Sequence, residues 1–330
     1  MKIPTFEEAL KTYCEIARLE RAKSERPSET TVRNVISGIG RILSVVHAVE
    51  NEGVEDGLSE DPMRKPITWL SRRKMELFLA HAAENRINST SAHSYLHHLK
   101  ALTARWTRPY YADRGYRVPS FEMPVCRVRV NRYRRPERRI LLEVKDWYDA
   151  LYLREDKRDW LAATLMLEFA VRNGDVGRLK WSDFVERRIV VDPEQNDVRT
   201  CICLCYTPRK TSLSSGRSVS WPVHEKLWAQ MNAARAASAE HRGTHFQGLV
   251  VPAAARVFKR LNKDLKSHHF FTGTHKGIYE LRKICVDHIY QQYGAEKASA
   301  ISGDDIHTVT QYYADPSAVN VVGVRIVDLL

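Results

Sequence analysis

Apolar side chains recur at helical spacing in four stretches of the first 115 residues. Apolar positions three and four residues apart share one face of a helix, so each stretch predicts an amphipathic helix. The first stretch opens with Thr5 followed by Glu8, which is the spacing of a capping box. The last helix is expected to end at Pro109, because proline cannot continue a helix. The four stretches cover residues 5–23, 28–49, 71–86 and 88–111.

The hydrophobic pattern changes after residue 140. Two helical stretches, at residues 142–155 and 158–172, come first. Short runs separated by turn-forming residues then predict strands over residues 187–191, 198–207 and 216–223. Helical spacing resumes at residue 224 and continues to the end of the chain. The fold expected is therefore mainly α with a small antiparallel β-sheet, in two domains: a helical one over residues 1–115 and a mixed one over residues 140–330.

Residues 116–139 lack the apolar positions of a core and contain Pro119, Pro124 and Pro136, so we interpret them as a linker. Seven arginines and one acidic residue occupy positions 127–139. The whole chain carries a net charge of +12, which favours a polyanionic partner such as DNA. A solvated basic surface is the alternative. The candidate DNA-binding residues are Arg127, Arg129, Arg132, Arg134 and Arg135.

The remaining composition narrows the class of protein. Hydrophobic residues make up 43% of the chain and no apolar run approaches the ~20 residues of a membrane span, so we expect a globular protein that is not in a membrane. The N-terminus carries no signal-peptide pattern, which predicts a cytoplasmic location, at the nucleoid when bound to DNA. Cys201, Cys203 and Cys205 alternate, as residues on one face of a strand do, and their spacing does not favour a metal site.

Several residues could carry chemistry. Arg172 ends an apolar helix, where a buried charge requires an anion; Asp175 is one possible partner. Lys210 lies between two predicted strands, where it is either an exposed hairpin lysine or a proton donor that reaches into a cleft. Tyr279 and Arg282 are three residues apart on a predicted helix and so face the same way.

Two adjacent tyrosines, Tyr312 and Tyr313, lie near the C-terminus in "TVTQYYADPS". They could pin a terminal helix to the core. Alternatively, one of them is a nucleophile, because a phenol can form a covalent intermediate when a neighbouring group helps it to lose its proton.

Four stretches together resemble the tyrosine recombinase (phage integrase) family. "AVRNGDVGRLKWSDF" is similar to its box G-L-R-x-x-E-L-x-x-L-x-W-x-D, with Arg172 as the arginine. "KTSLSSGRSVSWPV" resembles its K-T-x-x-x-R-x-V-P hairpin, with Lys210 as the lysine. "YELRK" resembles H-x-L-R-H, with Arg282 as the arginine. "SGDDIHTVTQYYADPS" resembles L-G-H-x-x-x-x-T-T-x-x-Y-x-H-P-S and places Tyr313, rather than Tyr312, on the nucleophile.

This resemblance implies a helical core-binding domain followed by a mixed α/β catalytic domain. It implies that Tyr313 attacks a phosphate of double-stranded DNA and forms a 3′-phosphotyrosine. Arg172 and Arg282 would stabilise the transition state, and Lys210 would be the general acid for the leaving 5′-oxygen. Neither ATP nor a metal nor another cofactor is required. Self-association on DNA, from dimer to tetramer, is expected.

The chain departs from the family pattern at two positions. Tyr279 replaces the first histidine of the motifs and Asp304 replaces the second, although both remain candidate catalytic residues. An ionised aspartate can only accept hydrogen bonds and would repel a phosphate unless it turned away. His307 or His275 could substitute. Two alternatives therefore stay open: a catalytically impaired DNA-binding relative, and a DNA-joining relative such as a telomere resolvase or a type IB topoisomerase.

The apolar tail after Ser317 is the last feature with a functional reading. It could fold back on its own domain. It could instead dock on a neighbouring protomer, as the segment around or beyond the nucleophile often does in the family.

Overall fold

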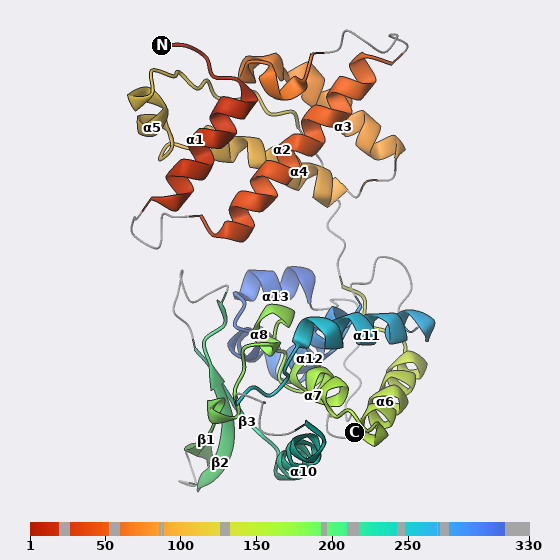
Figure 1. Cartoon of the computed structure of the whole chain (residues 1–330). Coiled ribbons are helices and arrows are strands. Elements are labelled where there is room, and N and C mark those ends of the chain that lie inside the picture. Colours follow the sequence, from red (N-terminus) through yellow and green to blue (C-terminus); the bar gives the residue numbers. More distant parts are fainter. Residues whose placement is uncertain are drawn as a thin grey trace. The chain divides into compact units, whose positions relative to one another are not determined.

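The helices expected from the first hydrophobic pattern form one unit of the structure, Met1–Val130, and the mixed pattern forms a second, Asn131–Leu330 (Figure 1). The first unit contains α1 (Phe6–Arg18), α2 (Glu29–Glu50), α3 (Arg72–Glu84), α4 (Ser89–Leu102) and α5 (Arg108–Asp113). This computed structural model describes the chain except for residues 20–26, 53–59, 86, 88, 126–132, 193–196, 210–217, 243–247, 269, 271–276 and 314–330.

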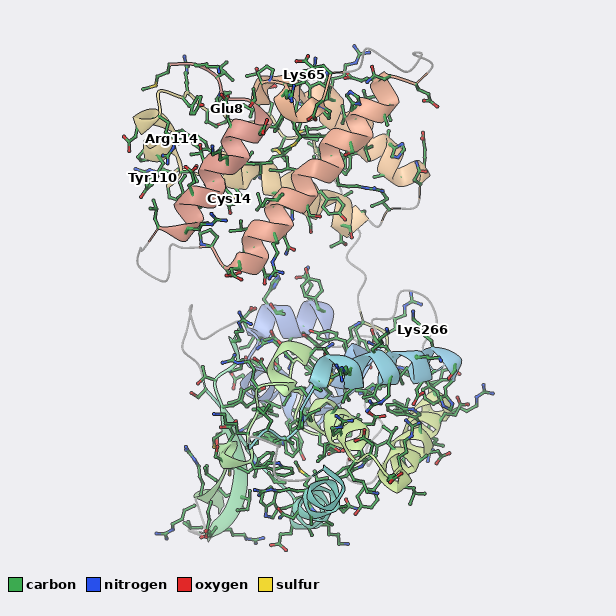
Figure 2. All side chains as sticks on the ribbon, in the orientation of Figure 1. Glu8, Cys14, Lys65, Tyr110, Arg114 and Lys266 are labelled. Atoms are coloured by element: carbon green, nitrogen blue, oxygen red, sulfur yellow. The ribbon has the colours of Figure 1, made fainter. Side chains whose placement is uncertain are left out.

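The start of α1 follows the sequence prediction. The Glu8 backbone N–H donates to Thr5 Oγ1 at 3.2 Å, and the Thr5 N–H donates to Glu8 Oε2 at 2.8 Å. This reciprocal capping box satisfies two N–H groups that the helix itself leaves without acceptors. Glu8 lies at this end of α1 in Figure 2, and further along the helix Glu15 pairs with Arg114 at 2.8 Å. The predicted capping box is confirmed.

The single helix predicted up to Pro109 is wrong. α4 ends at Leu102, and Pro109 instead lies in the first turn of the separate helix α5. Proline is tolerated in a first turn because its missing N–H would have no partner there. The buried Thr107 hydroxyl lies within hydrogen-bond distance of two carbonyls, that of Leu102 at 3.0 Å and that of Ala104 at 2.7 Å, which fixes the break between the two helices.

The core of the first unit explains the apolar character of α2. This 22-residue helix is long and apolar enough for a membrane span, with a mean hydropathy of 1.2 over its most apolar 18 residues. Most of its apolar side chains, however, pack inside the helical unit against α3 and α4, although Ile36 is exposed. The buried residues of α2 are Val35, Gly38, Ile39, Ile42, Leu43, Val45 and Val46.

The second unit is built around α7 (Arg158–Leu167), every residue of which is buried. The other helices are α6 (Arg138–Leu153), α8 (Asn173–Val176), α10 (Glu225–Arg242), α11 (Ala254–Ser267), α12 (Tyr279–Ser302) and α13 (Ile306–Tyr312). The strands are β1 (Phe184–Asp192), β2 (Asp197–Tyr206) and β3 (Val219–Pro222). The expected fold class, mainly helical with a small antiparallel sheet, is confirmed.

The three strands form an antiparallel sheet in the order β1-β2-β3. Phe184 pairs with Leu204 and Leu204 with Trp221, which fixes the register across the sheet. The alternating cysteines lie on β2 as predicted, with the sulfur atoms of Cys201 and Cys203 3.6 Å apart. Residue 210 belongs to the segment that connects β2 to β3.

Both ends of the expected linker pack against a unit. Val118, Phe121 and Met123 pack against the core of the first unit. On the other side, Tyr133 is buried and Arg135 Nε donates to Asp287 Oδ2 at 2.7 Å. Since that carboxylate is almost fully buried, the ion pair ties the start of the second unit to α12.

Candidate active site

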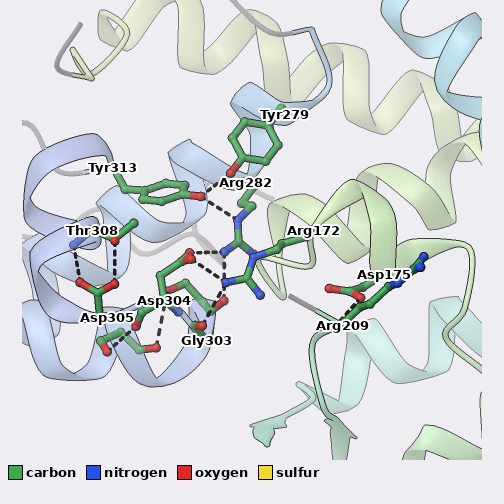
Figure 3. Close-up of polar contacts among 12 residues, drawn as sticks. Arg172, Asp175, Arg209, Tyr279, Arg282, Gly303, Asp304, Asp305, Thr308 and Tyr313 are labelled. Carbon is green, nitrogen blue, oxygen red and sulfur yellow. Dashed lines mark hydrogen bonds and ion pairs between the residues drawn. The ribbon is translucent and has the colours of Figure 1, made fainter. Parts of the chain in front are cut away.

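Arg172 reaches the site through a tight turn after α7. The apolar helix ends at Leu167, earlier than the sequence indicated, and Arg172 is the N-cap residue of α8. Between them Ala170 adopts a left-handed backbone with φ of 50°, which glycine adopts most readily. Arg172 does not pair with Asp175. Its Nη2 donates to Asp304 Oδ1 at 2.5 Å instead (Figure 3).

Asp304 lies in a turn between α12 and α13, and the hydroxyl groups of two serines near the end of α12 hold its backbone. Ser299 Oγ donates to the Asp304 carbonyl at 2.7 Å, and the Asp304 N–H donates to Ser302 Oγ at 3.2 Å. Gly303, which ends α12, has φ of +62°. A Cβ at this position would lie 3.1 Å from Pro208 Cγ. The turn therefore requires glycine both for its backbone and for its space.

We expect Gly303→Ala to lower the free energy of unfolding by about 1–2 kcal/mol, because a side chain there meets both a left-handed backbone and a close neighbour. Urea unfolding of the purified protein measures the change. Gly174→Ala is the matched control: Gly174 lies in α8 and a Cβ there meets nothing within 4 Å, so this variant should be neutral or slightly stabilising. Equal effects of the two substitutions on the free energy of unfolding would contradict the requirement for glycine at position 303.

Tyr279 and Arg282 face the same region from the first turn of α12, as their spacing predicted. Arg282 is fully buried, and its Nη2 donates to Asp304 Oδ2 at 2.5 Å and to the Ser302 carbonyl at 2.9 Å. Burial disfavours the charge of this guanidinium, but the neighbouring Tyr313 and Asp304 outweigh burial and raise its pKa. Arg282 is therefore a cation at any physiological pH.

Of the two adjacent tyrosines, Tyr313 lies in the cluster. It is 5% exposed, its hydroxyl hydrogen-bonds that of Tyr279, and Arg282 Nε lies 3.4 Å from its Oη. Tyr312 is 45% exposed. Burial raises the pKa of the Tyr313 hydroxyl, a shift that the charge of Arg282 opposes and that Tyr279 and Asp304 reinforce. The Tyr313 hydroxyl is thus protonated at neutral pH.

Three buried polar atoms in the cluster have no hydrogen-bond partner within the described part of the chain: Arg172 Nη1, Arg282 Nη1 and Tyr206 Oη. Buried guanidinium nitrogens are normally paired, because an unpaired one loses its hydration without compensation. Burial raises the pKa of Tyr206 to about 12, a shift that the charges of Arg282 and Arg172 oppose. Sequence reasoning missed Tyr206. Its only signal was its place as the last residue of β2, directly before the lysine hairpin.

The structure brings together five of the six candidate catalytic residues: Arg172, Tyr279, Arg282, Asp304 and Tyr313. The sixth, Lys210, lies outside the described residues. The residue before it is held close to the cluster, since the Arg209 N–H donates to Asp175 Oδ1 at 3.0 Å. Asp175 thus holds the last described residue before Lys210.

The remaining candidates are either outside the described residues or exposed or paired away from the cluster. Arg127, Arg129, Arg132, His275 and the tail after Ser317 are outside the described residues. Arg134 is exposed, whereas Arg135 is engaged with Asp287. His307 is exposed on α13 and forms no part of the cluster. Among the residues that the structure describes, no group of three or more His, Cys, Asp or Glu side chains could hold a metal ion.

Comparison with solved structures identifies the fold as that of the tyrosine recombinases. A lambda integrase, solved as a tetramer bound to a Holliday junction, superposes with a TM-score of 0.62 at 15% identity, covering 98% of this chain and 80% of that one. The XerH site-specific recombinase on palindromic difH DNA gives 0.58 at 10% identity, with 96% and 94% covered. The Tn1549 transposon integrase with transposon right end DNA gives 0.55 at 12%, with 94% and 95% covered.

The likeness is one of fold across nearly the whole chain, whereas the four sequence motifs lie in its C-terminal half. No protein-family model and no curated protein sequence matches this chain. Identities of 10–17% leave the chemistry to be argued from the site itself.

Proposed function

We propose that this protein is a site-specific DNA recombinase that cuts and rejoins DNA through a tyrosine. The observation that carries the proposal is a Tyr313 hydroxyl beside Arg282, which shares Asp304 with Arg172, while each arginine keeps one buried nitrogen with no hydrogen-bond partner among the described residues. A phenol next to unpaired guanidinium donors is suited to attack a phosphodiester, whose negative oxygens those donors would bind. The DNA complexes of the structural neighbours support double-stranded DNA as the substrate and assembly on it.

The proposed step forms a bond between Tyr313 Oη and phosphorus and breaks the bond from phosphorus to the 5′-oxygen. The tyrosine gives its proton to water, and the leaving 5′-oxygen takes one up from Lys210, as the hairpin motif suggests. A free 5′-hydroxyl of a partner strand then attacks the phosphotyrosine and returns its proton to Lys210, and the leaving tyrosine regains a proton from water. The energy of the broken bond is kept in the phosphotyrosine, so the exchange consumes no ATP. Such a protein would act on DNA in the cytoplasm.

Arg172 and Arg282 would bind the non-bridging oxygens of the phosphate, where charge accumulates during the attack. Tyr279, which stands where the family motif has histidine, can donate its hydroxyl to a phosphate oxygen once Tyr313 has turned to the phosphorus. The site thus has donors for the phosphate and a nucleophile, which are the parts that phosphoryl transfer without a cofactor needs.

A nicked suicide substrate tests the proposal. When the scissile phosphate lies close to a nick, the short fragment that carries the 5′-hydroxyl diffuses away and the covalent intermediate accumulates. We expect a protein–DNA adduct on denaturing gels, with the DNA located on the peptide that contains Tyr313 by mass spectrometry. Binding without an adduct would indicate a DNA-binding relative that does not cut. Hairpin ends or relaxed circles as products would indicate a telomere resolvase or a topoisomerase instead.

The exposed Arg134 gives a test of the DNA-binding surface. We expect Arg134→Gln to weaken binding to all DNA sequences similarly and to reduce the slope of log K against log salt by about 0.9, which corresponds to one lost phosphate contact. Fluorescence anisotropy over a salt series measures the slope. Lys226→Gln removes the same charge from the exposed start of α10 and should leave the slope unchanged. An unchanged slope for Arg134→Gln would show that this side chain faces solvent in the complex.

A further inference from the structure

The two arginines of the site are held in the same way. Each uses its Nη2 for two hydrogen bonds, one to a backbone carbonyl of the turn after α12 and one to an oxygen of Asp304. Arg172 Nη2 donates to the Gly303 carbonyl at 3.0 Å and to Asp304 Oδ1; Arg282 Nη2 donates to the Ser302 carbonyl at 2.9 Å and to Asp304 Oδ2. A terminal guanidinium nitrogen has two N–H groups, so both Nη2 atoms are fully used.

The opposite terminal nitrogens are left over. Nη1 of Arg172 and Nη1 of Arg282 are buried and make no hydrogen bond within the described residues. One carboxylate therefore holds both guanidinium groups by their Nη2 atoms (Figure 3), and the Nη1 atom of each has no acceptor among the described residues. Planar forks held in this way are preorganised for two oxygens of one anion.

Asp304 is a fixed part of the turn. Its carbonyl and its N–H both form hydrogen bonds with serine hydroxyls, and its side chain is 7% exposed. Its charge also matters. Two arginines and one carboxylate leave a net charge of +1, which matches the single negative charge of a phosphodiester. Without Asp304, two cations would lie side by side in a buried site.

We propose that Asp304 is a positioning residue that aligns Arg172 and Arg282 for the phosphodiester and does not itself contact the DNA. This inference rests on the proposed function and assigns a role to the residue at which the chain departs from the histidine of the motif. The Asp304 carboxylate keeps its hydrogen bonds to the two Nη2 atoms, and the phosphate accepts hydrogen bonds from the two Nη1 atoms. Because each carboxylate oxygen serves one arginine, the alignment depends both on the charge and on the length of the side chain.

The test separates DNA affinity from the rate of cleavage. Asp304→Glu keeps the charge but moves the carboxylate by one methylene group, and we expect DNA affinity within about twofold of wild type with cleavage at saturating protein slowed about 10- to 100-fold. Asp304→Asn removes the charge and keeps one acceptor; we expect equal or tighter DNA binding, with cleavage slower than in the Glu variant. Single-turnover cleavage of the suicide substrate gives the rate, and anisotropy gives the affinity.

Asp146→Asn is the matched control, because it removes one exposed carboxylate from the same unit. Thermal unfolding of every variant shows whether the fold is kept, and the Glu variant decides the question if the Asn variant unfolds. Wild-type cleavage by Asp304→Glu would overturn the proposal, as would faster cleavage by Asp304→Asn, which would make Asp304 a block to the phosphate. Absence of an adduct with the wild-type protein would instead refute the proposed function, and the binding measurements would still report on Asp304.

Discussion

Tyr313→Phe is expected to abolish the covalent protein–DNA adduct while leaving DNA affinity within about twofold of wild type. The substitution removes only the attacking oxygen, and the buried ring keeps its place against Tyr279 and Arg282. Adduct formation on a nicked substrate, quantified on denaturing gels, gives the first quantity and anisotropy the second. We expect a loss of at least ~10⁴-fold, because phenylalanine has no oxygen with which to form the covalent bond.

Tyr312→Phe is the matched control for this experiment. It removes the same hydroxyl from the adjacent, exposed ring, and should form adduct at close to the wild-type rate. If Tyr312→Phe lost the adduct and Tyr313→Phe kept it, the nucleophile would be Tyr312. Equal loss in both variants would indicate that the end of α13 is disturbed, a result that thermal unfolding would reveal.

The environment of Tyr313 also constrains how it could attack. Burial raises the pKa of its hydroxyl, so the phenol must lose its proton as the bond to phosphorus forms. In this structure its hydroxyl is hydrogen-bonded to that of Tyr279 and lies near Arg282. These contacts hold the Tyr313 hydroxyl inside the cluster. A phosphate bound to the arginines would compete for the same donors and release the hydroxyl for attack.

Local patterns predicted the helices and strands well. Periodicity placed Tyr279 and Arg282 on one face of α12, and alternation placed the cysteines on β2. The predicted helix ends were wrong where the effect of a residue depends on where in a helix or turn it lies. Pro109 was read as a stop, whereas it lies in the first turn of α5. The end of α7 was placed too late because Ala170, unlike a glycine, gives no sign of a left-handed turn.

The site was harder to predict than the fold, because its contacts join residues far apart in the chain. Asp175 is three residues from Arg172 and was the nearest possible partner, yet the observed partner is Asp304, 132 residues away. From the sequence alone, the expectation was therefore that an ionised Asp304 would repel a phosphate unless it turned away. Only the turn set by Gly303 shows that the carboxylate faces the arginines, and Tyr206 enters the cluster only through the register of the sheet.

The second large effect is expected from Arg172→Ala, which should slow cleavage by at least ~10²-fold, the scale for losing one preorganised donor group in a phosphoryl-transfer site. Nη1 of Arg172 has no hydrogen-bond partner among the residues that the structure describes, and Nη2 pairs with one oxygen of Asp304. Arg172→Lys keeps the charge but loses the planar fork. A lysine cannot donate both to Asp304 and to a phosphate in fixed directions, so we expect it to recover little of the rate.

Arg178→Ala is the control for this pair of variants, since Arg178 belongs to the same segment but is 59% exposed at its side chain and lies 3.9 Å from Asp175. Its cleavage rate should stay within about twofold of wild type. Single-turnover rates at saturating protein separate cleavage from DNA binding, which all three variants should largely keep. Near-native cleavage by Arg172→Ala would remove this arginine from the site and, with it, the argument that its free nitrogen is reserved for the phosphate.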